Sequence, residues 1–309
     1  MQPLATSIYN AHIDVVHGCQ LRCIGCPNST LLPKVHRMPL EHFHRILGNL
    51  DVEKIHTMRL FNYGEPLLHK ELSKLVAIIP EQKFKTSIVE ISTNAQQVYW
   101  EDFEEVIRLE VVNKLVVSCD GDGTPEDYEA KRPPSKWENL IEFLERARIL
   151  RDRYAPAMQL ITSTVCMDAI HRKRWEDVLI PRGWTPKFRR WMALPQSAVN
   201  MTGSAPVIPA SLCLYVASAD RFVSHKWDGQ INLLYVDYDG TVVPCCQHPR
   251  AGVLGNLLEN SYNEILFGKK RAEFVAQLER NRADLPVCGK CDVGPPDSPG
   301  PSFSAAMDA

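Results

Sequence analysis

The chain has 309 residues, of which 45% are apolar and 23% charged, as in a globular protein with one large domain and a smaller one. Its formal net charge of −2 gives no broad basic surface for nucleic acid, and no apolar run reaches the length of about 18 residues that a membrane span needs. The first residues lack the pattern of a secretory signal, so we expect a cytoplasmic protein without a nucleic-acid or membrane partner.

Short apolar runs alternate with helical patterns from residue 8 to about residue 194. Apolar residues recur at helical spacing from Leu40 to Leu50 and again from Leu140 to Leu150. Such a series of βα units predicts an α/β fold with a parallel sheet and helices outside it, either open or curled into a partial barrel. The predicted strands are Ala11–Val16, Lys54–Phe61, Ile88–Ser92, Lys114–Ser118, Gln159–Val165 and Lys187–Met192.

The pattern changes in the last third of the chain. A hairpin is predicted there, with strands at Gln230–Asp237 and Thr241–Pro244 joined by an Asp-Gly turn, and a helix follows over Tyr262–Arg280. We therefore divide the chain into a core (1–194), a Pro-, Ser-, Ala- and Gly-rich linker (195–212), a small α+β domain (213–292) and a Pro-rich tail that we expect to be disordered (293–309).

Cys19, Cys23 and Cys26 follow the first predicted strand in a C-x3-C-x2-C pattern. Tetrahedral zinc takes four protein ligands, or three and a water, and ferredoxin clusters use four cysteines at other spacings. Three thiolates instead leave one iron of a four-iron cluster open to a small molecule. Their position after a strand predicts that they lie at the carboxyl end of the sheet, where α/β folds carry their sites. A zinc knuckle is the alternative interpretation.

Three later strand ends carry polar motifs that, together with this triad, resemble the radical S-adenosylmethionine (SAM) family. Asn62–Pro66 (NYGEP) is similar to that family's Gly-Gly-Glu-Pro motif, with Tyr63 in place of the first glycine. Ser118–Gly121 (SCDG) resembles its Ser-x-Asp-Gly motif, and Ser92–Asn94 ends the strand between the two. Each segment alone is more often a turn or a helix cap. Their order at successive strand ends favours the resemblance.

The resemblance implies a partial (β/α)6 barrel in which the triad holds a [4Fe–4S] cluster and SAM binds the open iron. The cluster, reduced by a partner such as flavodoxin or ferredoxin, would cleave SAM to methionine and a 5′-deoxyadenosyl radical that removes hydrogen from a small-molecule substrate. One departure is Gly25, where many relatives have an aromatic residue, so Ile24 becomes the candidate for packing on the adenine. The residues implied to contact SAM are Tyr63, Gly64, Glu65, Ser92, Thr93, Asn94, Ser118 and Asp120.

A second cysteine group lies in the predicted small domain. Gly240 precedes Cys245 with the Gly-x4-Cys spacing of SPASM and twitch domains, so Cys245 is assigned as a ligand. Adjacent residues of a strand face opposite sides, so Cys246 is not assigned as a ligand of the same cluster. The resemblance to the short, twitch form implies one auxiliary [4Fe–4S] cluster, and a structural zinc site with the same thiolates is the alternative. The implied ligands are Cys213, Cys245, Cys288 and Cys291.

The overall layout is similar to that of 2-deoxy-scyllo-inosamine dehydrogenase. This implies dehydrogenation of an alcohol in an aminoglycoside- or cyclitol-like natural product, with electron transfer to the auxiliary cluster. One alternative is a radical epimerase of a sugar, aminoglycoside or peptide, with Cys246 or Cys119 as the hydrogen donor. Others are a maturase of ribosomal peptides and a non-catalytic metal-binding scaffold.

Arg189 and Arg190 lie next to each other on the sixth predicted strand. Alternation along a strand sends only one of them toward the cavity of the core. That arginine is a candidate to bind a hydroxyl or carboxylate of the substrate, and an ion pair facing a helix is the alternative.

Overall fold

The computed structural model describes residues 4–189 except 27, 33 and 167, and then residues 213, 224–225, 230–231, 233–246 and 248–291. The predicted linker, the predicted tail and Arg190 lie outside the described residues. Within the described part of the chain, no helix has the length and apolar content needed to cross a bilayer.

Six parallel strands pair in chain order, which confirms the predicted α/β fold and partial (β/α)6 barrel. Each of the six predicted strands corresponds to one of these, and residues 190–192 of the last prediction lie outside the described residues. The first runs from Ser7 to Ile13, whereas the prediction was Ala11–Val16. Its start was predicted too late because polar side chains such as Asn10 interrupt the apolar run there. The strands are β1 (Ser7–Ile13), β4 (Lys54–Arg59), β5 (Lys85–Thr93), β6 (Lys114–Ser118), β7 (Gln159–Val165) and β8 (Thr185–Arg189).

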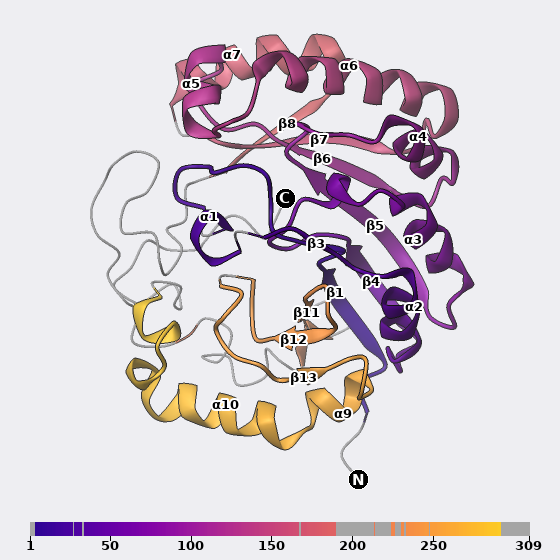
Figure 1. The fold of residues 1–309 in the computed structure, drawn as a ribbon, viewed down its shortest axis with the longest axis vertical. Coiled ribbons are helices and arrows are strands. Elements are labelled where there is room, and N and C mark those ends of the chain that lie inside the picture. Colours follow the sequence, from indigo (N-terminus) through magenta and orange to yellow (C-terminus); the bar gives the residue numbers. More distant parts are fainter. Residues whose placement is uncertain are drawn as a thin grey trace.

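Helices cover the outer face of this sheet (Figure 1). Apolar strand side chains such as Met58 and Val117 pack in one core with Phe43 and Leu144 of the helices. Full burial of an aliphatic or aromatic side chain stabilises the fold by about 1.5–3 kcal/mol. The two predicted helical patterns correspond to α2 and α6. The elements are α2 (Leu40–Gly48), α3 (Leu72–Ile78), α4 (Trp100–Arg108), α5 (Pro125–Lys131), α6 (Trp137–Tyr154) and α7 (Ala169–Leu179), with short turns η1 (Pro66–Leu68), η2 (Ile79–Glu81) and η3 (Ile180–Arg182).

The opposite, inner face of the sheet carries a polar row. The strand register aligns His12 of β1 with Arg59 of β4 and Glu90 of β5, and paired residues of parallel strands share a face. Arg59 Nε lies 3.3 Å from Glu90 Oε1, and Arg59 Nη1 lies 3.1 Å from His12 Nε2. We call these three residues the inner row. It lines the face of the sheet that the helices leave uncovered.

The C-terminal segment continues the same sheet. β11 (Leu233–Val236) pairs in parallel with β1, and the predicted hairpin returns as β12 (Thr241–Val243). Gly240 in the turn has φ 82, a left-handed conformation that glycine adopts without strain. β13 (Gly255–Asn256) completes a sheet of nine strands. Shorter elements are β2 (Val16–His17), α1 (Asn28–Leu31), β3 (His36–Arg37), β9 (Ser224–His225) and β10 (Gln230–Ile231).

The single helix predicted over Tyr262–Arg280 is two helices, α9 (Tyr262–Leu266) and α10 (Lys269–Asn281). Gly268 separates them as the N-cap of α10, where a Cβ would lie 2.5 Å from the carbonyl oxygen of Glu264. Glycine also has a low helix propensity, so the break follows from this residue. The turns η4 (Arg282–Asp284) and η5 (Cys288–Lys290) follow.

Polar contacts hold the C-terminal segment against the N-terminal core. Asn263 accepts a hydrogen bond from Ala5 N at 2.8 Å, and its Nδ2 donates to the carbonyl oxygens of Ala5 and Asp51 at 3.1 Å. His17 Nδ1 lies 2.8 Å from an oxygen of Asp237 in the hairpin turn. Because a buried amide must satisfy its hydrogen bonds, Asn263 fixes the position of α9 on the core.

Candidate active site at the carboxyl ends of the strands

The cysteine triad lies in a loop that leaves β1 and turns back across the strand ends. Gly18 has φ 86, and a Cβ there would lie 2.4 Å from the carbonyl oxygen of Lys34. The backbone N–H of Arg22 donates to Pro133 O at 2.5 Å, and that of Ile24 donates to Lys131 O at 2.9 Å. The loop is therefore held to the end of α5, on the far side of the barrel from β1.

The three thiols are buried enough to need a positive partner. Burial, followed by the charge of Glu65, raises the pKa of Cys19 to about 12. Burial raises the pKa of Cys23 to about 11, although the nearby Arg132 guanidinium opposes the shift. Thiolates form in such surroundings when a metal supplies positive charge, since metal coordination deprotonates a thiol.

The cysteines of the chain are free thiols in this structure. Among the described residues, no three His, Cys, Asp or Glu side chains converge closely enough to ligate one metal ion. All ten cysteines, each within the described residues, are thiols and none forms a disulfide.

The Asn62–Pro66 motif wraps around a carboxylate that the sequence did not single out. The backbone N–H groups of Asn62, Tyr63 and Gly64 donate to Asp14 at 2.7, 2.9 and 3.0 Å. Burial and the neighbouring charge of Asp237 raise the pKa of Asp14 to about 7. A Cβ at Gly64 would lie 1.5 Å from Val16 O, so this position requires glycine. The available signal was an acidic residue placed directly after the first strand.

Glu65 ties this motif to the end of β5. Its carboxylate accepts hydrogen bonds from Leu67 N at 3.0 Å, Thr93 Oγ1 at 2.7 Å and Asn94 N at 2.6 Å. Burial raises the pKa of Glu65 to about 7. A carboxylate has about four acceptor positions, and donors from the described residues fill three of them, so Glu65 can accept one further donor. The sequence-predicted residues Glu65, Thr93 and Asn94 are thus brought together.

Asn94 connects Glu65 to the cysteine triad. Its side-chain Nδ2 donates to Cys19 Sγ at 3.3 Å, and it forms a paired amide contact with Gln20. The sequence predicted that Asn94 contacts SAM. In the structure, protein groups occupy both polar atoms of its side chain.

Asp120 and Arg132 form a buried ion pair at the other end of the site. One oxygen of Asp120 accepts from Val165 N at 3.0 Å, and the other pairs with Arg132 Nη1. Arg132 Nε has no hydrogen-bond partner among the described residues, although the side chain is buried. A guanidinium donor and a carboxylate together suit the two opposite charges of a zwitterion such as the amino-acid part of a ligand. Arg132 belongs to no sequence motif, and only its tertiary position marks it.

Three thiols of the second group gather at the end of the described chain. Burial, followed by the charge of Cys213, raises the pKa of Cys288 to about 11, and Cys291 contributes in the same direction. Arg282, itself buried, donates from Nε to the carbonyl oxygen of Cys288 at 2.7 Å. A buried guanidinium thus accompanies each thiol group, which suits a negatively charged metal–thiolate cluster.

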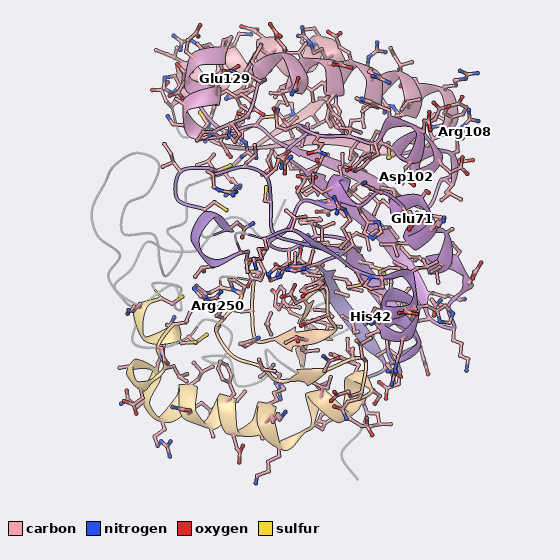
Figure 2. All side chains as sticks on the ribbon, viewed as in Figure 1. His42, Glu71, Asp102, Arg108, Glu129 and Arg250 are labelled. Carbon is pink, nitrogen blue, oxygen red and sulfur yellow. The ribbon has the colours of Figure 1, made fainter. Side chains whose placement is uncertain are left out.

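Cys245 and Cys246 are both half-buried just after β12. The carbonyl oxygen of Cys245 accepts a hydrogen bond of 2.8 Å from the hydroxyl of Tyr63. Arg250, labelled in Figure 2, lies beside α1 and donates to Leu31 O at 2.8 Å. The segment around Cys245 therefore contacts both the NYGEP motif and the region that follows the triad.

The remaining predicted site residues lie apart from these contacts. Cys119 is buried in the apolar core, with its thiol directed to Val117 O at 3.8 Å. Arg189 lies on β8 and donates from Nε to Ser163 Oγ at 3.1 Å, on the inner face by register. Ser92 and Ser118 share that face and are half-buried, while Ile24 is 45% exposed.

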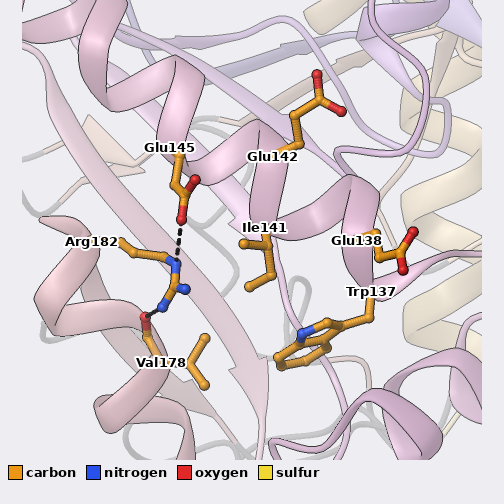
Figure 3. A pocket seen from close by; sticks show the side chains of 7 residues that line it. All are labelled: Trp137, Glu138, Ile141, Glu142, Glu145, Val178 and Arg182. Atoms are coloured by element: carbon orange, nitrogen blue, oxygen red, sulfur yellow. Dashed lines mark hydrogen bonds and ion pairs between the residues drawn. The ribbon is translucent and has the colours of Figure 1, made fainter.

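A pocket of about 620 Å³ lies on the outer side of the barrel, between α6 and the end of α7 (Figure 3). Its walls are Trp137, Ile141 and Val178, and Arg182 forms an ion pair with Glu145 at 3.2 Å across it. No thiol is among the residues that line it. The chemistry-bearing residues therefore lie at the carboxyl ends of the strands.

Two family models match the chain. The model of the radical SAM superfamily matches residues 13–158, and that of SPASM, an iron–sulfur cluster-binding domain, matches residues 229–292. No curated protein matches the sequence.

Solved structures share this fold along almost their whole length. The crystal structure of BtrN in complex with AdoMet and 2-DOIA is 18% identical, with a TM-score of 0.53, and the alignment covers 95% of this chain and 96% of BtrN. The structure of anSMEcpe with bound AdoMet is 15% identical, with a TM-score of 0.60 and coverage of 92% and 86%. At these identities the similarity concerns the fold.

Proposed function

This chain belongs to the radical SAM superfamily and carries a C-terminal SPASM iron–sulfur domain, and on that premise we propose that it oxidises an alcohol group of a small aminoglycoside- or cyclitol-like molecule to a carbonyl group. Its cofactors are SAM and [4Fe–4S] clusters. In this family the reduced cluster and SAM together supply a 5′-deoxyadenosyl radical. The protein orients the cofactors and the substrate and excludes water.

We assign the cofactor-holding residues from their contacts. The triad of Cys19, Cys23 and Cys26 would hold the first cluster. Glu65 and Arg132 would bind the two charged ends of the amino-acid part of SAM, because among the described residues Arg132 Nε has no partner and the Glu65 carboxylate can accept a further donor. The auxiliary cluster would be held by Cys213, Cys245, Cys288 and Cys291.

The inner row offers a binding surface for a polyhydroxylated amine. Burial and the nearby Arg59 lower the pKa of His12 to about 3, so its imidazole stays neutral. Arg59 is therefore held between a neutral acceptor and the Glu90 carboxylate, with donors left for a hydroxyl. Glu90 provides the acidic partner that an amino group of the substrate needs. Arg189 is a further candidate, since its register directs it to the same face.

Oxidation requires a route for one electron to leave the substrate. The carbon of the alcohol would give a hydrogen atom to the 5′-deoxyadenosyl radical, its oxygen would give a proton to solvent, and one electron would pass to an acceptor as the carbonyl forms. The hydrogen bond of 2.8 Å from the Tyr63 hydroxyl to the backbone carbonyl of Cys245 supports such a route, because it joins the NYGEP motif to a residue of the second cysteine group. The second group is where we expect the acceptor of that electron to be held.

The proposed reaction needs an electron donor and a reducing environment. The electron that reduces the first cluster would come from a partner such as flavodoxin or ferredoxin. A reducing compartment such as the cytoplasm would keep ten thiols from pairing as disulfides.

The test uses anaerobically reconstituted protein with SAM, a reductant and candidate amino-cyclitols. About eight irons per chain are expected for two [4Fe–4S] clusters. A carbonyl product formed together with 5′-deoxyadenosine would support dehydrogenation. A substrate recovered with one inverted stereocentre and solvent deuterium would instead identify an epimerase, with half-buried Cys246 as the donor. Absence of SAM cleavage under reducing conditions would leave only the scaffold alternative. A serine- or cysteine-containing peptide, offered in parallel, tests peptide modification.

A further inference from the structure

The side chain of Asn94 is fixed between the triad and its own strand end. Nδ2 donates to Cys19 Sγ at 3.3 Å and to Gln20 Oε1 at 3.2 Å. Oδ1 accepts from Gln20 Nε2 at 3.1 Å and from the backbone N–H of Gln96 at 3.0 Å. Both polar atoms of this buried amide are therefore occupied by protein groups.

The orientation of the amide follows from its partners. A backbone N–H can only donate, so the atom facing Gln96 N must be the oxygen of Asn94. The NH₂ group is thereby directed to the sulfur of Cys19. That sulfur also receives the backbone N–H of Leu21 at 3.4 Å. Cys19 thus has two N–H donors aimed at its sulfur, one of them from a side chain that mutation can remove.

The backbone of the same residue contacts the proposed SAM site. Asn94 N donates to Glu65 Oε2 at 2.6 Å, and Ala95 N donates to Thr93 Oγ1 at 3.0 Å. Ala95 has φ 60, a left-handed conformation that costs an L-residue about 1–2 kcal/mol. The turn therefore has a strained residue directly after Asn94. The contacts of Asn94 with Glu65 and Cys19 fix its own position between these two residues.

We propose that Asn94 is a positioning residue that sets the reduction potential of the triad cluster and links it to SAM bound at Glu65. The proposal rests on the proposed function. A hydrogen bond to a thiolate ligand stabilises negative charge on the sulfur, so it favours the reduced cluster and raises its potential. A change at Glu65 reaches Cys19 through one residue, because Asn94 contacts Glu65 with its backbone and Cys19 with its side chain.

The experiment compares the reconstituted holoenzyme with Asn94→Leu, which keeps the side-chain volume and removes the donor. The control is Gln97→Leu, which removes an exposed amide that contacts only Tyr99 in the described structure. Redox titrations followed by electron paramagnetic resonance are run with and without SAM. The cluster whose signal responds to SAM should have a more negative midpoint potential in Asn94→Leu, and SAM should shift that potential less. Gln97→Leu should match the wild type.

A second variant keeps the proposal testable if Asn94→Leu fails to load iron. Asn94→Asp keeps the shape of the side chain and replaces its N–H donor by a carboxylate oxygen, so a more negative midpoint potential is again expected. Wild-type protein with a SAM-responsive cluster, together with unchanged potentials in both loaded variants, would overturn the role of Asn94 alone. Wild-type protein whose clusters do not respond to SAM would overturn the proposed function and this role together.

Discussion

Tyr63, which stands where the radical SAM motif has its first glycine, donates a hydrogen bond of 2.8 Å to the carbonyl oxygen of Cys245, 182 residues further along the chain. The residue that departs from the family pattern is therefore one of those that join the two halves of the site. The contact is fixed at both ends, because the Tyr63 backbone is bound to Asp14 and Cys245 follows β12.

Replacing Tyr63 by Phe removes this hydrogen bond and keeps the ring. A net hydrogen bond contributes about 0.5–1.5 kcal/mol, so the protein should fold. The position of the second thiol group relative to SAM should loosen, and the amount of oxidised product per 5′-deoxyadenosine should fall severalfold while SAM cleavage continues. Chromatographic quantification of both products measures the ratio. Tyr154→Phe, whose hydroxyl contacts Glu104 at the surface, is the control. An unchanged ratio in Tyr63→Phe would refute the link.

Gly64→Ala is expected to prevent formation of the site. The new Cβ would lie 1.5 Å from Val16 O, and backbone atoms cannot move aside as a flexible side chain can. We expect a loss of about 3 kcal/mol or more in unfolding free energy, or insoluble protein. Gly48→Ala is the matched control, because a Cβ added there, at the end of α2, would meet nothing within 4 Å. Urea unfolding of the two variants should separate them clearly, and equal stabilities would show that the loop adapts.

The buried carboxyl of Asp14 predicts a pH dependence of stability. Its pKa is about 7 in the folded protein against 3.8 for the ordinary group, so between these values the native state binds more protons than the unfolded state. The contribution of Asp14 to stability therefore falls as pH rises from about 4 to 7. Asp14→Asn should flatten this part of the profile. Metal-free protein is used for the unfolding curves, because acid also destroys iron–sulfur clusters. A variant profile parallel to that of the wild type would contradict the assignment.

Ala95→Gly should stabilise the protein by about 0.5–1 kcal/mol. Glycine adopts the observed φ of 60 without the steric cost that alanine meets, and the gain exceeds the larger entropy that glycine has in the unfolded chain. The same substitution in a helix, Ala77→Gly in α3, should destabilise by a similar amount. Thermal unfolding midpoints of the two variants, measured together, should move in opposite directions.

The strands and the polar motifs at their carboxyl ends were predictable from the sequence, because both depend on the local pattern of apolar and polar residues. Apolar runs marked all six strands, and the carboxyl ends of parallel neighbours must meet at one edge, which brought Glu65 and Asn94 to the triad. Arg132 and Asp14 escaped prediction, since a charged residue after a helix or a strand is ordinary until the fold surrounds it. The specific bond from Asn94 to Cys19 depends on the path of a loop, which no periodicity encodes.

The joining of the two segments into one sheet was also beyond prediction. β11 has the same kind of short apolar run as a strand of a separate domain, and its parallel pairing with β1 spans more than two hundred residues of chain. The hairpin itself was predictable from its Asp-Gly turn, and the break before α10 could have been read from Gly268. Partners distant in the chain leave no mark in either strand.

The pairing of β11 with β1 also bears on how the chain is made. A parallel sheet ending at β1 would present a row of open backbone donors and acceptors, which other chains can pair with. The nascent core therefore carries an unprotected edge until the last quarter of the polypeptide has been synthesised. Contacts so distant in sequence form slowly. Truncation before β11 should consequently give an aggregating core rather than an independent barrel, and the iron–sulfur segment acts as the final closing piece of the fold as well as part of the site.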